Sequence, residues 1–178
     1  MMIDSPCVLL IGAFEKHSGK TTLSEKIVRK FADNGIYAVK ITILRSDEEI
    51  EKYSITEDSE IRPDKDTGRL KLAGAVKVFW VRCAEFSAQK AIEEVLSMIP
   101  AGYPVLCESN MARKYMKPAV FVMVARDIRV STKDTAAAVE KFADMITVSQ
   151  VADGKLIYKP DVCDLLKWED RKWKLADR

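Results

Sequence analysis

The sequence predicts an α/β fold with three layers, in which helices cover both faces of a mostly parallel β-sheet. Apolar, β-branched runs of strand length recur along the chain, and amphipathic stretches with helical spacing lie between several of them. The runs are apolar throughout, which is typical of strands buried on both faces of a parallel sheet. We predict strands at residues 7–12, 37–44, 76–83, 104–108, 119–125 and 145–149.

Three amphipathic stretches predict the helices. The first carries Leu23, Ile27 and Phe31 on one face and ends at Gly35, a residue type common just after a helix. The other two stretches show the same spacing. Their apolar faces comprise Ala88, Ile92, Val95 and Ile99, and then Val139, Phe142 and Ala143. In a sheet of this kind, ligands bind at the carboxyl ends of the strands.

Length and composition fit a single domain, residues 1–178, and exclude several classes of protein. The chain is long enough to bury a core without metals or disulfides. Hydrophobic residues make up 48% and charged residues 31%, and no apolar run approaches the ~20 residues that cross a bilayer. The start lacks a signal-peptide pattern, and the net charge of +2 is spread along the chain. We expect a cytoplasmic protein that binds neither membranes nor nucleic acid.

The cysteines give no sign of a metal site. The four of them are widely spaced without a C-x-x-C pair, and the chain has one histidine, His17. Zinc is therefore not expected. Three of the thiols fall in predicted strands, where we expect them to act as small hydrophobes in a reducing compartment.

Two segments depart from the regular alternation of strand and helix. Residues 45–75 form a mostly polar insertion that is far longer than usual connections, so we expect it to be functional or mobile. Its acidic run at residues 47–51 is a solvated face or a docking surface. The tail, residues 155–178, contains a short apolar strand and then two apolar stretches around a charged turn, which resembles a hairpin.

A candidate phosphate site follows the first predicted strand. A loop leads to Ser18 and Gly19, and Lys20, Thr21 and Thr22 open the first helix. In this order of strand, loop and helix, backbone amides and the positive end of the helix dipole converge on phosphate oxygens. The pattern is that of a P-loop, in which Gly19 lets the backbone approach and Lys20 reaches the β and γ phosphates. Thr21 would ligate Mg²⁺, and Thr22 would donate to the α phosphate.

The loop differs from the usual G-x-x-x-x-G-K-[ST] pattern at one position. Phe14 stands where the first glycine is expected, and the nearest glycine is Gly12. The loop therefore either turns two residues earlier or is longer than usual. Lys16 and His17 are candidates for phosphate contact, and the alternatives are a solvated charge and an exposed loop histidine.

A carboxylate at a strand end is the second part of the predicted site. Glu108 ends an apolar run, where it can hold the metal or activate the attacking group, and a surface loop is the alternative. In the insertion, Asp66 can reach Mg²⁺ through water and Arg69 can neutralise phosphate charge, unless the segment is a simple charged turn. The candidate catalytic residues are thus Lys20, Glu108 and Asp66. The candidate metal ligands are Thr21, Asp66 and Glu108.

These motifs resemble those of the MobB family, the P-loop proteins associated with molybdopterin-guanine dinucleotide biosynthesis. The resemblance covers roughly the first 110 residues and keeps the order of the family's motifs. The matching segments are residues 18–23, residues 35–40, Asp66-Thr67-Gly68-Arg69, Ala73-Gly74-Ala75 and Glu108. The resemblance implies GTP binding, weak hydrolysis, an accessory role beside a nucleotidyl-transferring partner enzyme and, often, a homodimer.

The residues themselves leave three functions open. The first is a slow, Mg²⁺-dependent nucleoside triphosphatase that assists a partner enzyme. The second is a small-molecule kinase that uses ATP, with Asp66 or Glu108 orienting the acceptor hydroxyl. The third is a non-catalytic binding module. The chain lacks the Asn-Lys-x-Asp motif that reads guanine, so ATP and GTP are both candidate ligands.

Overall fold

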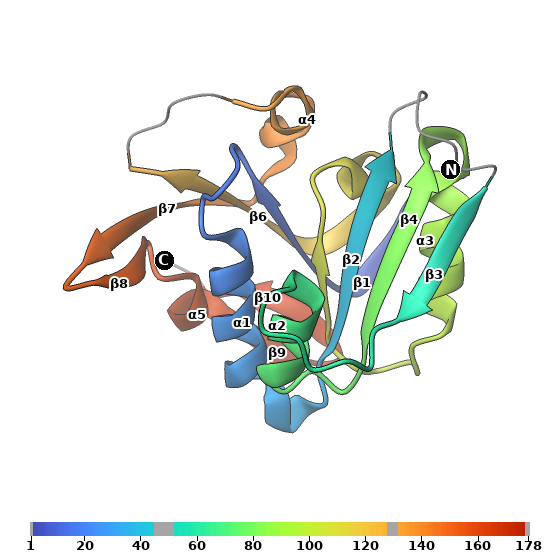
Figure 1. Ribbon diagram of the computed structural model, residues 1–178, viewed down its shortest axis with the longest axis horizontal. Helices are drawn as coiled ribbons and strands as arrows, with labels where there is room; N and C mark the ends of the chain where they lie inside the picture. Colours follow the sequence, from blue (N-terminus) through green and yellow to red (C-terminus); the bar gives the residue numbers. More distant parts are fainter. Residues whose placement is uncertain (1, 45–51, 128–131, 177–178) are drawn as a thin grey trace.

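The computed structural model describes residues 2–44, 52–127 and 132–176 and has an α/β fold built on an eight-stranded sheet (Figure 1). The strand order is β3-β4-β2-β5-β1-β6-β7-β8. The six inner strands are parallel, and the edge strands β3 and β8 are antiparallel to their neighbours. The predicted mostly parallel sheet is therefore confirmed. The strands are β1 (Ile3–Ala13), β2 (Tyr37–Leu44), β3 (Tyr53–Glu57), β4 (Val78–Ala84), β5 (Val105–Glu108), β6 (Met116–Arg126), β7 (Met145–Ala152) and β8 (Lys155–Lys159).

Helices cover both faces of this sheet. Alternate residues of β1 point to opposite sides, so that Leu9 packs in one apolar cluster and Leu10 in the other. Helices α1 (Lys20–Lys30) and α2 (Asp66–Leu72) share the Leu9 cluster and lie in front of the sheet in Figure 1. Helix α3 (Ala88–Ser97) shares the Leu10 cluster on the opposite face. Burial on both faces explains why the inner strands are apolar throughout.

The third predicted helix is broken into two short pieces. It is divided between α4 (Asp134–Ala137) and a 3-10 turn, Glu140–Phe142. The backbone at Val139 leaves the helical region, with a φ of −127°, and this interrupts the helix. Phe142 is consequently 41% exposed, although helical spacing predicts it on the buried face.

The insertion contains a strand and a helix that the sequence did not reveal. Its residues 45–51, with the acidic run, lie outside the described residues. Strand β3 is an edge strand whose side chains are all partly or fully exposed. In α2, a Cβ atom added to Gly68 would lie 2.0 Å from the carbonyl oxygen of Arg62. This close approach explains a glycine inside a helix, where it ordinarily lowers stability.

The C-terminal tail adds a hairpin to the α1 face of the sheet. Strands β9 (Leu166–Glu169) and β10 (Lys172–Leu175) pair in antiparallel fashion, and this is the hairpin predicted for the tail. Trp173 is buried, and its ring meets Phe31 edge-on with 4.8 Å between the ring centroids. Its indole N–H donates to the carbonyl of Val105 at 3.3 Å. The hairpin therefore covers sheet surface that a helix would cover elsewhere.

The strand order creates a crevice at the carboxyl end of β1. This strand lies between β5 and β6, and the chain crosses it when passing from β5 to β6. In open α/β sheets, ligands bind at such a reversal of strand order. The β1–α1 loop and Glu108 at the end of β5 lie at this crevice, since Ile11 and Glu108 are register partners. No helix in the described part of the chain combines the length and apolar character needed to cross a bilayer.

Candidate functional site

The β1–α1 loop begins at Phe14, not at Gly12. Strand β1 continues through Gly12 to Ala13, and the amide of Phe14 donates to the carbonyl of Val124 in β6 at 3.0 Å. The prediction of a turn two residues earlier is therefore wrong. Gly12 is needed for packing, since an added Cβ would lie 2.4 Å from the sulfur of Met123. The side chain of Phe14 is fully buried and anchors the start of the loop in the core.

The loop ends in two left-handed residues and an uncapped helix. His17 has a φ of 58° and Gly19 a φ of 83°. An added Cβ at Gly19 would lie 2.4 Å from the side chain of Leu156 in β8 and 3.0 Å from the hydroxyl of Tyr158, so these side chains would have to shift. Helix α1 then starts at Lys20, and no side chain caps it. The amides of its first turn have no intrahelical acceptor and are available to a ligand.

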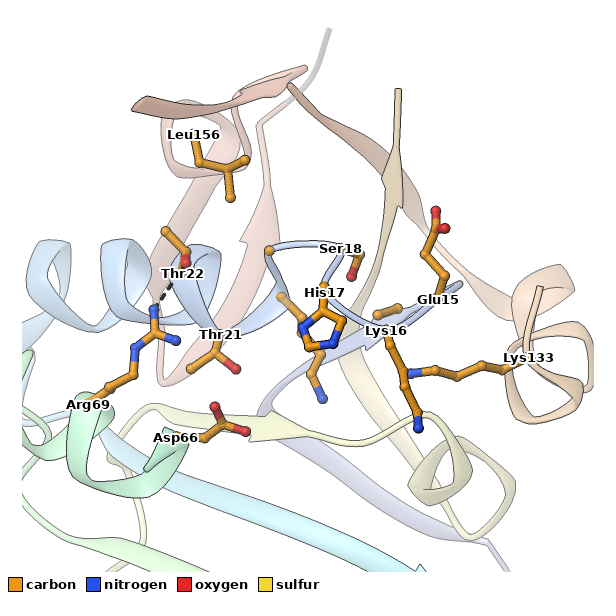
Figure 2. A pocket seen from close by; sticks show the side chains of 13 residues that line it. Glu15, Lys16, His17, Ser18, Thr21, Thr22, Asp66, Arg69, Lys133 and Leu156 are labelled. Atoms are coloured by element: carbon orange, nitrogen blue, oxygen red, sulfur yellow. Dashed lines mark hydrogen bonds between the residues drawn. The ribbon is translucent and has the colours of Figure 1, made fainter. Parts of the chain in front are cut away.

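A cavity of about 530 Å³ opens in front of this loop. Figure 2 shows Asp66 and Arg69, from α2, on one side of the loop and Leu156 on the other. Every predicted phosphate-contacting residue lies on the cavity wall, together with the predicted Asp66. The lining residues are Ala13, Glu15, Lys16, His17, Ser18, Gly19, Lys20, Thr21, Thr22, Asp66, Arg69, Lys133 and Leu156.

Glu108 lies behind the cavity, against the start of α1. Its side chain is buried, and its Oε2 lies 3.5 Å from both the ammonium of Lys20 and the hydroxyl of Thr21. Its Oε1 has no hydrogen-bond partner among the described residues. A buried carboxylate is costly unless it is paired. The structure thus brings together Lys20, Thr21 and Glu108, from segments far apart in the sequence.

Asp66 is the first residue of α2 and forms an ion pair with Lys40 of β2. Burial raises the pKa of Asp66, but the hydrogen bond from Lys40 and the charges of Lys40 and Lys20 outweigh this effect. The pKa of Asp66 is therefore lower than its ordinary value, and the group stays ionised. The segment that contains it is the start of a helix and not a simple charged turn.

Arg69 connects α2 with α1. Its Nη2 donates to the hydroxyl of Thr22 at 3.0 Å and to the carboxylate of Glu25 at 2.6 Å. The hydrogen bond to Glu25 raises the pKa of Arg69 further. Arg69 therefore reaches the cavity with part of its charge already balanced, and its contact with phosphate stays a prediction.

Sequence reasoning missed Lys133, which lines the cavity from the segment before α4. Its amide donates to the carbonyl of Phe14 at 2.8 Å, which places it beside the loop. Burial lowers the pKa of Lys133, and the positive charges of Lys20 and Lys16 lower it further. No motif marks this lysine, because only the tertiary fold brings it to the loop.

One other contact at the loop was also missed. The hydroxyl of Tyr158 in β8 donates to the carbonyl of Gly19 at 2.7 Å, which ties the sheet edge to the loop. The hydroxyl of Ser18 is buried without a hydrogen-bond partner among the described residues. Lys40 left a signal in the sequence, since it is a charge inside an otherwise apolar strand.

Comparison with known proteins identifies no relative. No protein-family model, curated protein or solved structure matches the chain. Within the described residues, no three His, Cys, Asp or Glu side chains gather into a metal-binding group. The geometry of the loop and its surroundings therefore carries the functional argument.

Proposed function

We propose that the chain is a P-loop nucleoside triphosphatase that binds ATP or GTP with Mg²⁺ and hydrolyses it slowly. The observation that carries this proposal is the uncapped start of α1, which opens into a cavity where Lys20 faces the buried Glu108. An uncapped helix N-terminus with lysines around it favours an anion. The cavity volume of about 530 Å³ lies within the range of small-molecule sites.

The loop residues have distinct roles in phosphate binding. The left-handed Gly19 turns the backbone so that the first amides of α1 face the cavity. Lys20 reaches the β and γ phosphates, and Thr22 donates to the α phosphate. The buried hydroxyl of Ser18 supplies a further donor. Lys16, like Lys133, adds positive charge on the side of the cavity away from α2.

The oxygen donors of the site fit Mg²⁺. This ion prefers hydroxyl, carboxylate and water oxygens and keeps several of its waters. The Oε2 of Glu108, which lies 3.5 Å from the hydroxyl of Thr21, fits an ion or one of its waters. Thr21, Glu108 and Asp66 would hold the ion or its water shell. When bound, the ion neutralises charge on the β and γ phosphates.

Slow turnover is expected because most of the nearby carboxylate oxygens are already engaged, which leaves Oε1 of Glu108 as the base. The Oε2 of Glu108 faces Lys20, Asp66 pairs with Lys40, and Glu15 accepts from the amide of Arg126 at 3.3 Å. A carboxylate held by a cation is a weak base toward water. Slow hydrolysis suits an accessory role beside a partner enzyme, which the resemblance to the MobB family implies and which we include in the proposal.

The experiment is thermal unfolding of the protein with Mg²⁺ and ATP, GTP, ADP or GDP. A ligand that binds the folded state at 100 times its Kd stabilises it by about 2.7 kcal/mol, so the melting temperature rises. A shift selective for guanine nucleotides would support the MobB-like role. If none of the four nucleotides raises the melting temperature, the proposal is wrong.

The matched variants are Lys20→Ala and Lys90→Ala. Lys20→Ala removes the cation of the loop, and we expect at least tenfold weaker triphosphate binding by calorimetry, or about 1.4 kcal/mol. Lys90 is an exposed lysine of α3, and its variant should bind as the wild type does. Unchanged affinity in Lys20→Ala would contradict the assigned site.

A further inference from the structure

A second cavity of about 280 Å³ lies beside the nucleotide cavity. The two share Ala13, Lys20 and Lys133 as a common wall. The remaining walls come from the carboxyl ends of β2 and β5, the segment after β5, and α4. This volume lies just below the usual range for ligand sites, about 300–1,000 Å³, so it suits a small metabolite and not a second nucleotide.

The charge at the common wall is suited to an anion. Lys40 also lines the second cavity, but Asp66 balances its charge, and Lys20 faces Glu108. The charges of Lys20 and Lys16 act against that of Lys133, and the opposite charge of Glu15 is the smallest of these effects and offsets them only in part. An anionic group beside Lys133 would relieve this repulsion.

Glu108 offers the second cavity a hydrogen-bond acceptor. Its side chain is 1% exposed, and it lines this cavity but not the nucleotide cavity. Its Oε2 faces Lys20 and Thr21, whereas its Oε1 has no partner among the described residues. A buried carboxylate oxygen without a donor is unfavourable. A ligand hydroxyl in the second cavity would supply that donor.

The wall between the two cavities is fixed by Asn110. Its side chain donates to the carbonyl of Ala13 at 2.9 Å and to the hydroxyl of Thr135 at 3.3 Å. It also accepts from the amide of Ala13 at 2.8 Å. A second ligand would therefore be held by a preformed wall next to Lys20, which is the arrangement that transfer between two bound molecules needs.

We propose that the second cavity binds a small hydroxylated anion whose hydroxyl group accepts the γ-phosphoryl group of the nucleotide. The proposal rests on the nucleotide site proposed above. Lys133 binds the negative group of the acceptor, and Oε1 of Glu108 receives its hydroxyl.

The transfer balances with no further reactant. The hydroxyl oxygen forms a bond to the γ phosphorus, and the bond from that phosphorus to the β–γ bridging oxygen breaks. The electron pair leaves with the nucleoside diphosphate, and the hydroxyl proton passes to Glu108. The products are a phosphate ester and a diphosphate. Without an acceptor, water takes its place and hydrolysis is slow.

Three-carbon probes that differ in charge test this proposal. The protein, saturated with Mg²⁺ and the triphosphate that it binds best, receives glycerol 3-phosphate, glycerate or uncharged glycerol. We expect an anionic probe to accelerate diphosphate release at least tenfold and to give a new phosphate ester by ³¹P NMR, whereas glycerol does neither. The two anions distinguish recognition of a phosphate group from recognition of a carboxylate.

Failure of this inference differs from failure of the nucleotide site. If neither anion exceeds glycerol in rate or product while nucleotide still raises the melting temperature, the acceptor cavity is overturned and the nucleotide site stands. If no nucleotide raises the melting temperature, both are overturned.

A filled cavity provides the second test. Thr135→Phe places a ring in the second cavity, and we expect it to abolish the acceleration while the nucleotide still raises the melting temperature. The matched variant Thr132→Phe, at an exposed position outside this cavity, should keep the acceleration. Acceleration that survives in Thr135→Phe would overturn the proposal.

Discussion

The candidate site has two halves that the chain builds in different ways. The loop half is the continuous segment 14–22, which acts through its backbone, with left-handed turns and an uncapped helix start. The framing half is a set of side chains from α2, β5, the segment before α4, and β8. Neighbours in the sequence encode the first half, whereas only the tertiary fold assembles the second. In the proposed function, phosphate binding would depend mainly on the loop half, and chemistry on the framing half.

The largest expected effect separates these two roles at Glu108. In Glu108→Gln, we expect the turnover number to fall about 100-fold, because the amide is a poor base, while the Kd for triphosphate changes little. Single-turnover phosphate release and calorimetry measure the two quantities. Loss of the folded state in circular dichroism would instead identify Glu108 as a structural residue.

Gly19→Ala tests the backbone of the loop half. The substitution strains a left-handed residue and pushes its methyl group toward Leu156, so we expect triphosphate affinity to fall at least tenfold by calorimetry. Gly154→Ala is the control, because Gly154 has a φ of 70° and nothing within 4 Å of an added Cβ. Equal losses in both variants would mean that backbone strain, and not the position at the loop, causes the effect.

Tyr158→Phe tests the contact between the two halves. It removes the hydrogen bond to the carbonyl of Gly19 and keeps the buried ring, so we expect about 1 kcal/mol less stability in urea unfolding. Triphosphate affinity should fall slightly as the loop loosens. Tyr103→Phe is the control, since Tyr103 is 42% exposed. A matching loss in that variant would rule out a specific effect at Gly19.

Lys40→Met gives the smallest effect and tests one ion pair of the framing half. The lowered pKa of Asp66 contributes stability that is present above its ordinary value, near pH 4, and is lost as pH falls through the native value. We expect the variant to be less stable by about 0.5 kcal/mol at pH 7, since the pair is partly exposed. This difference in urea unfolding should shrink at acid pH, whereas a constant difference would indicate lost packing.

The inner strands could be predicted because burial on both faces requires an apolar residue at nearly every position. Strand β3, Tyr53–Glu57, was not predicted because it lies at the edge of the sheet and pairs with β4 alone. Its side chains are partly or fully exposed and need not be apolar, so its sequence has no continuous apolar run. Helix α2 escaped because it is short and contains Gly68, whose presence follows from contact with Arg62 and not from helix propensity.

The candidate site, like the fold, was predictable only in part. The loop residues and Glu108 lie where a continuous motif and a strand end predict them. Lys133 and Tyr158 reach the loop only because β6, β7 and β8 extend the sheet past it, and no local pattern records this arrangement. The sequence therefore predicts where the site lies better than it predicts which residues surround it.

The burial of Trp173 has a consequence for the nascent chain. The ribosome delivers β10 after every strand of the main sheet, yet this tryptophan packs against Phe31 near the end of the first helix. Until it emerges, the apolar surface around Phe31 and Val105 lacks its cover and is open to chaperones or to other nascent chains. The apolar cluster on the α3 side does not depend on β10, because all of its buried residues precede β10 in the sequence and are translated earlier.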